Sequence, residues 1–178
     1  GFDNAVASMG TALTVEQTRL LSRFTKELVL CYDNDNAGKI ATERALQILN
    51  GSEFSVKVLQ LPRRLVDGEY IKQDADDFIK LQGPDAFERL LNGSENGVEF
   101  RMAQIAGKYD LKDDEARIAY CGEVSELLAS LPGAVEREIY TGRAAEAAGI
   151  TAEAMKLEVQ RSFKRRIARE KRAEHFNR

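Results

Sequence analysis

Three short apolar runs in the first third of the chain have the length and composition of β-strands. They cover residues 6–8, 28–32 and 56–61. The second run has no polar alternation, which predicts a strand buried on both faces of a sheet. Helical patterns lie between the runs, so strand and helix alternate along this part of the chain. Alternation across short turns predicts a parallel α/β sheet with flanking helices.

The two helices between these strands have recognisable starts. Thr14 and Gln17 have the spacing of a capping box, which predicts a helix from there to about Ser22. Asn36 opens the second helix, whose apolar residues share one stripe until Asn50–Gly51 ends it.

The pattern changes after residue 62. Residues 63–73 are predicted as a charged loop, and the polar segment 92–97 is typical of a linker. Helical spacing dominates the rest of the chain. Five helices are predicted there, at residues 74–81, 84–91, 113–128, 135–148 and 151–176. We therefore predict an α/β domain at 1–92, followed by an all-α subdomain at 93–178.

Composition narrows the class of protein. Apolar residues make up 43% of the chain and charged residues 31%, which excludes a wholly disordered or collagen-like chain. No apolar run approaches the ~20 residues that cross a bilayer, and we expect no signal peptide. Cys31 and Cys121 lie in apolar surroundings without a Cys-x-x-Cys pair. This usage predicts reduced, buried thiols in a cytoplasmic protein that contacts no membrane.

Charge is distributed unevenly along the chain. Residues 161–178 contain eight Lys or Arg against Glu170 and Glu174, a net charge of +6. Because the whole chain carries −3, the residues before this segment carry −9. An acidic body with a basic end indicates a cation-binding body, a nucleic-acid-binding end, or both. A solvated basic helix would explain the tail equally well.

Two carboxylates follow the second predicted strand directly. Asp33 and Asp35 are two residues apart, which on an extended chain places them on the same side. Ligands of open α/β sheets bind at the carboxyl ends of the strands. Two carboxylates there repel each other unless a cation neutralises them, and oxygen ligands favour Mg²⁺ or Mn²⁺.

A second acidic pair, Asp74 and Asp76, follows the third strand and is joined by Asp77. A single acidic pair at a helix start is usually a cap. Two pairs after consecutive strands converge on one edge of the sheet, which favours a metal site. An EF-hand loop is excluded because its fifth and twelfth positions would be Ala37 and Arg44. A receiver-like domain, which also gathers acids at strand ends, stays open.

The segments 4–14 and 28–39 resemble the later part of the Toprim domain of bacterial-type (DnaG) DNA primases. They contain Ser8-Met9-Gly10-Thr11 and Asp33-Asn34-Asp35-Asn36-Ala37-Gly38. The family continues with a strand ending in Leu-Pro and then Lys-Asp-Pro-Asp, to which 61–62 and Gln73-Asp74-Ala75-Asp76 correspond. Leu131-Pro132-Gly133 and the residues after it resemble the helical subdomain that follows Toprim in these primases.

The resemblance implies a DNA primase that synthesises RNA primers on a single-stranded DNA template from ribonucleoside triphosphates. It implies metal-assisted nucleotidyl transfer with Mg²⁺ or Mn²⁺, in which Asp33 and Asp35 are the catalytic metal ligands. Asp74 and Asp76 then line the same metal site. The alternatives are another Toprim protein, topoisomerase-like or nuclease-like, and a non-enzymatic receiver-like or nucleic-acid-binding module.

Parts of the family pattern are not found in these 178 residues. We expect an upstream strand with an essential glutamate, an N-terminal zinc module, and a helicase-binding domain beyond Arg178 to be absent here. Zinc is then expected only in that module, and the chain alone is expected to be inactive. Loss of a neighbouring strand predicts self-association, or exposure of Leu28, Leu30 or Val58 at an open sheet edge.

Overall fold

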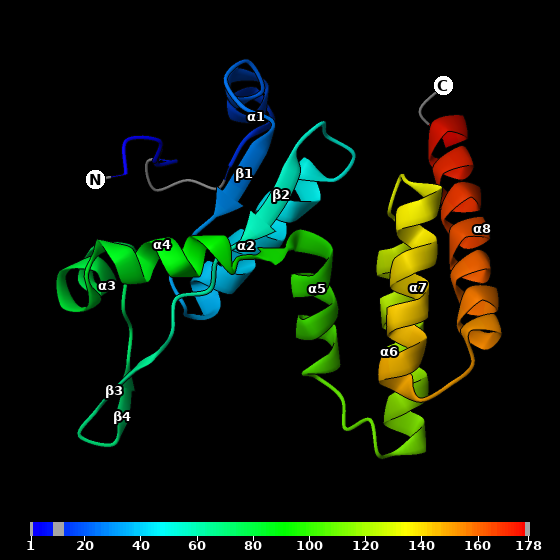
Figure 1. The fold of residues 1–178 in the computed structure, drawn as a ribbon. Coiled ribbons are helices and arrows are strands. Elements are labelled where there is room, and N and C mark those ends of the chain that lie inside the picture. The colour runs from blue at the N-terminus through cyan, green and yellow to red at the C-terminus, as the bar shows by residue number, and fades with distance from the viewer. Residues whose placement is uncertain (1, 9–12, 177–178) are drawn as a thin grey trace. The chain divides into compact units, whose positions relative to one another are not determined.

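Two separately packed units make up the structure, a computed structural model that describes residues 2–8 and 13–176. The first unit covers residues 1–100 and contains the five strands of the described chain, and the second covers residues 101–178 and is helical (Figure 1). The predicted order of an α/β part followed by an all-α part is confirmed. None of the described helices is long and apolar enough to cross a membrane.

Three strands form the sheet of the first unit in the order β1, β2, β5. β1 (Glu27–Leu30) and β2 (Ser55–Val58) run parallel, with Leu30 opposite Val58. β5 (Glu95–Asn96) lies antiparallel on the other side of β2. The predicted strand–helix–strand unit is therefore confirmed. The segment predicted as a linker contains β5.

The strand predicted at residues 6–8 is wrong, because the described residues 2–8 form no strand. Among the described strands β1 pairs only with β2, and Val6 is 76% exposed. A strand needs a neighbour that accepts and donates its backbone hydrogen bonds. No described strand does this for residues 6–8.

The burial of β1 also differs from the prediction. Leu30 is buried, but Leu28 is only partly buried and Cys31 is exposed, because β1 is an edge strand of the described sheet. Of the three residues predicted to be exposed at an open edge, Leu30 and Val58 are buried in an apolar cluster and Leu28 is partly buried. Self-association, the alternative outcome, stays a prediction. The prediction of buried thiols is wrong for Cys31 and only partly right for Cys121, which is half-buried. Neither thiol forms a disulfide.

Two apolar clusters cover opposite faces of the sheet. The first joins Leu30 and Val58 to Leu46 of α2, and the second joins Leu59 to Phe78 of α3. Successive residues of a strand point to opposite faces, so Val58 and Leu59 enter different clusters. The helices of this unit are α1 (Val15–Leu21), α2 (Asn36–Leu49), α3 (Ala75–Gln82) and α4 (Pro84–Asn92). The sheet is thereby held between helices, with the carboxyl end of β1 leading directly toward α2.

Local signals set the starts of these helices. The capping box of α1 is confirmed, because Thr14 accepts a hydrogen bond from Gln17 N while the Gln17 side chain accepts one from Thr14 N. α2 begins at Asn36 as predicted, with Asp35 as its cap.

Residues 63–73 contain a β-hairpin where a charged loop was predicted. β3 (Arg64–Val66) and β4 (Glu69–Ile71) pair antiparallel around the two-residue turn Asp67–Gly68. Both turn residues have positive φ, which an Asp-Gly pair tolerates in a tight hairpin. The Asp-Gly signal was present in the sequence, but the many charges around it favoured a loop. The hairpin lies largely in solvent, with Leu65 and Tyr70 exposed.

The second unit is a bundle of helices. α5 (Gly97–Ala106) precedes three helices that pack on one another: α6 (Asp114–Ala129), α7 (Ala134–Ala148) and α8 (Ala152–Phe176). Their packed positions are small or apolar and fully or almost fully buried, namely Tyr120, Val124, Leu128, Ala144, Ala145, Ala148, Met155 and Val159. The three long helices confirm the prediction within one residue at either end. The side chain of His175 lies outside the described residues.

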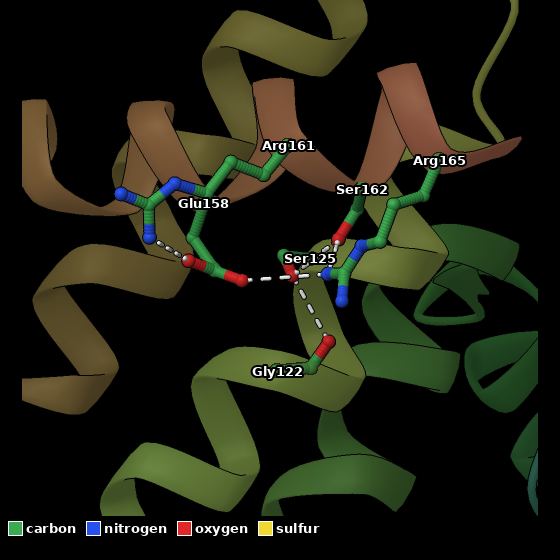
Figure 2. Close-up of polar contacts among 6 residues, drawn as sticks. All are labelled: Gly122, Ser125, Glu158, Arg161, Ser162 and Arg165. Carbon is green, nitrogen blue, oxygen red and sulfur yellow. Dashed lines mark hydrogen bonds and ion pairs between the residues drawn. The ribbon is translucent and has the colours of Figure 1, made fainter. Parts of the chain in front are cut away.

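One polar contact is buried between α6 and α8. Figure 2 shows the hydroxyls of Ser125 and Ser162 facing each other, 3.1 Å apart. The Ser125 hydroxyl also donates to the Gly122 carbonyl at 2.9 Å, and Arg165 Nη2 donates to Ser162 Oγ at 2.9 Å. These hydroxyls therefore have partners, which removes the cost of burying them.

Candidate metal centre

Asp35 occupies the junction between β1 and α2. Its backbone is extended, and its Oδ1 accepts a hydrogen bond from the backbone N–H of Gly38 at 2.7 Å. That N–H is one of the donors that every helix leaves unpaired in its first turn. The cap fixes the Asp35 carboxylate in one orientation and leaves Oδ2 available for a cation.

Gly38 brings α2 close to the backbone of Asp33. A Cβ at Gly38 would overlap the Asp33 carbonyl oxygen, an approach that no side chain tolerates. Only glycine therefore allows the first turn of α2 to approach the residue that bears the other carboxylate. This contact explains why the segment Asp33–Gly38 ends in glycine.

Asn34 lies between the two aspartates and faces another part of the sheet. Its Nδ2 donates to the carbonyl of Leu61, 2.5 Å away, just beyond β2. The loop after β1 is thus tied to the chain leaving β2, which helps to hold Asp33 and Asp35 in place. Burial raises the pKa of Tyr32 at the same end of β1, and a side-chain hydrogen bond with Ser8 of the primase-like segment partly offsets that rise. Gly10 and Thr11 of that segment lie outside the described residues.

Both carboxylates converge on the ammonium of Lys72. Lys72 Nζ lies 2.7 Å from Asp33 Oδ2 and 3.0 Å from Asp35 Oδ2. The Gly38 N–H and then Lys72 hold the pKa of Asp35 below its ordinary value, while the two carboxylates raise the pKa of Lys72. Sequence reasoning missed Lys72, which follows the hairpin and lies nearly forty residues from its partners.

The second acidic group surrounds the start of α3. Asp74 is the cap and accepts a hydrogen bond from Asp77 N at 2.8 Å, and Asp76 pairs with Lys80. Carboxylate oxygens of Asp74, Asp76 and Asp77 lie within 4.8 Å of one another, and all three residues are exposed. Within the described chain this is the one set of three such ligands at that spacing, and it does not include Asp33 or Asp35. A single cluster of both pairs stays a prediction.

The chemistry of the first pair suits a hard divalent cation. Two carboxylates supply the oxygen ligands that Mg²⁺ and Mn²⁺ prefer. Asp33 and Asp35 already hold one cationic group between them, so their oxygens converge on a position that a cation occupies. In this structure the Lys72 ammonium occupies that position.

Comparison with protein families gives two matches. Residues 1–79 match the family described as Toprim-like, and residues 98–153 match the DnaB-helicase binding domain of primase. The second match corrects our expectation that the helicase-binding part of the family lies beyond Arg178.

Curated relatives and solved structures agree with these matches. The DNA primases of Clostridium acetobutylicum and Enterococcus faecalis are each 35% identical, over 87% and 82% of this chain. The match covers 24% and 22% of those proteins, so the chain spans about a quarter of their length.

Two solved structures are similar in fold. A DNA primase domain from Pseudomonas aeruginosa aligns with a TM-score of 0.68 at 27% identity, over 88% of this chain and 48% of that one. A DnaG primase catalytic domain bound to single-stranded DNA aligns with a TM-score of 0.65 at 26% identity, over 83% and 45%. The chain is therefore similar over most of its length to the bacterial-type (DnaG) DNA primases, with a Toprim-like match at residues 1–79 and a match to the helicase-binding domain of primase at residues 98–153.

Proposed function

We propose that the protein to which this chain belongs is a DNA primase that synthesises RNA primers on single-stranded DNA. The observation that carries the proposal is the convergence of Asp33 and Asp35 on one cation at the carboxyl end of β1. In a chain similar to DNA primases, this position suits metal-assisted nucleotidyl transfer from ribonucleoside triphosphates.

In this proposal Asp33 and Asp35 hold Mg²⁺ or Mn²⁺, and Asp74 and Asp76 line the same acidic site. The bound metal neutralises the phosphate charge that develops as the nucleotide is transferred. The aspartates act as ligands and need not move protons. Asp35 contributes a carboxylate that its helix cap has already oriented, which lowers the cost of assembling the site.

The comparisons support two partners. Single-stranded DNA is bound in one of the similar structures, and we assign it as template for this protein. The replicative helicase is assigned to the helical segment at residues 98–153, which matches the DnaB-helicase binding family.

The proposal is tested by incubating the full-length parent with single-stranded DNA, ribonucleotides and Mg²⁺. We expect short RNA products that depend on both template and metal. Chelating the metal abolishes them, and residues 1–178 alone produce none. Cleavage or relaxation of DNA without RNA synthesis would instead support a nuclease-like or topoisomerase-like Toprim protein.

The basic half of α8 carries a second prediction. Arg161 and Arg165 share Glu158, at 3.3 and 3.4 Å, and are partly neutralised (Figure 2). Other cations of the helix are exposed and make no ion pair with residues 2–8 or 13–173. They are Lys164, Arg169, Lys171 and Arg172. We propose that this surface contacts the phosphates of the template.

Changing these four cations to Gln should flatten the salt dependence of single-stranded DNA binding by residues 1–178. Each lost phosphate contact lowers the slope of log K against log salt by about 0.7. Fluorescence anisotropy across a salt series measures it. The control changes four ion-paired lysines to Gln, an equal loss of charge, at Lys26, Lys80, Lys108 and Lys156. An equal change in slope for both variants would mean that only net charge matters.

A further inference from the structure

Lys72 occupies the position at which the metal is proposed to bind. Its ammonium is within hydrogen-bond distance of one oxygen from each aspartate. A divalent cation needs the same two oxygens at shorter distances, of about 2.1 Å for Mg²⁺. The ammonium and the metal therefore cannot occupy the site together.

The attachment of Lys72 allows it to leave. Lys72 follows β4, and the hairpin before it is exposed, with its three β4 residues all in solvent. The segment is anchored at its ends by Leu61 and Gln73, which are 1% and 7% exposed. The Lys72 side chain itself is about half exposed. Displacing its ammonium into water breaks two exposed ion pairs and opens no apolar core.

We infer that Lys72 is a built-in competitor of the divalent metal at Asp33 and Asp35. It neutralises the carboxylate pair when no metal is bound and is displaced when the metal enters. This inference rests on the proposed function, because it takes the metal to bind at Asp33 and Asp35. According to this inference Lys72, next to the β3–β4 hairpin, helps to set the affinity of the site for the metal.

Charge explains why the competition matters. Without a cation the two carboxylates repel each other, and Lys72 relieves this repulsion. The same positive charge opposes the entry of a divalent cation and remains nearby after displacement. Exposed ion pairs are individually weak, so Lys72 tunes metal affinity and does not block the site.

The test measures Mn²⁺ binding to residues 1–178 by electron paramagnetic resonance, comparing the chain with its Lys72→Gln variant. We expect Lys72→Gln to bind Mn²⁺ about fivefold to thirtyfold more tightly at low salt. The matched control is Lys26→Gln, which removes the same charge from an exposed ion pair with Glu53, a residue outside the proposed site. We expect that control to leave the high-affinity binding unchanged.

Further variants separate the possible failures. Asp33→Asn in the Lys72→Gln background should abolish the gain in affinity. If Mn²⁺ binding depends on Asp33 but Lys72→Gln binds no more tightly, the inference is overturned and the proposed metal site stands. A third outcome is that Lys80→Gln binds Mn²⁺ more tightly while Asp33→Asn leaves binding unchanged. The metal would then bind at the start of α3, and both the inference and the proposed ligands Asp33 and Asp35 would fail.

A second readout follows the hairpin. Saturating Mn²⁺ should accelerate hydrogen exchange in residues 64–71 of the unchanged chain, because it releases Lys72. In Lys72→Gln the exchange should already be fast and should not respond to Mn²⁺. Exchange that is insensitive to Mn²⁺ in both proteins would contradict displacement.

Discussion

Replacing Asp35 with Asn in the full-length parent should lower primer synthesis about a hundredfold to a thousandfold, in the range seen when a preorganised charge-stabilising group is removed. Asn retains an oxygen that can accept the Gly38 N–H, so the cap of α2 survives. What is lost is the negative charge that Oδ2 presents to a cation. Ribonucleotide incorporation on a single-stranded template measures the effect.

Asp113 provides a matched control for this substitution. It caps α6 in the same way as Asp35 caps α2, accepting a hydrogen bond from Ala116 N at 2.8 Å. Asp113→Asn therefore makes the same chemical change at a helix cap in the other unit. We expect it to leave synthesis within about twofold. An equal loss in both variants would show that Asp35 acts through helix capping alone.

We expect Gly38→Ala to lower the free energy of unfolding more than any other substitution near the site that adds one methyl group. The new Cβ would meet the Asp33 carbonyl, so α2 or the loop after β1 must move. Overpacking of this kind costs about 1–3 kcal/mol. Urea denaturation of residues 1–178, followed by circular dichroism, measures it. Mn²⁺ affinity should fall as well, because the movement separates Asp33 from Asp35.

Gly142→Ala is the control, with the opposite expected sign. Gly142 lies within α7, and a Cβ added there would have no atom of the described residues within 4 Å outside its own helix backbone and chain neighbours. Alanine is there a better helix former, by about 0.5–1 kcal/mol. A Gly38→Ala variant as stable as Gly142→Ala would contradict the close approach of α2 to Asp33.

Helices were predictable from sequence because their signals are local. Each signal lies within one or two turns of the helix that it predicts. The examples are the Thr14–Gln17 capping box, the start of α2 after Asp35 and the helical spacing of residues 113–176. The parallel pairing of β1 and β2 followed from the same local alternation. The aspartate pair after β1 was predictable too, because residues two apart on an extended chain lie on the same side.

Pairings between distant segments were decided by tertiary structure alone. A strand at residues 6–8 would need a neighbouring strand, and the described chain supplies none. Residues 95–96, in contrast, pair with β2 and form β5. Cys31 is exposed for a related reason, since its burial depends on what lies beside an edge strand.

By itself, then, the sequence determined the helices, the β1–β2 unit and the location of Asp33 and Asp35 at its carboxyl end. Only the tertiary structure decided that Lys72 lies between these carboxylates and that Asp74, Asp76 and Asp77 form a group without them. Short-range geometry follows from chain connectivity and hydrogen bonding within a few residues. The position of an ammonium nearly forty residues away depends on how the hairpin and the sheet pack, which no local pattern encodes.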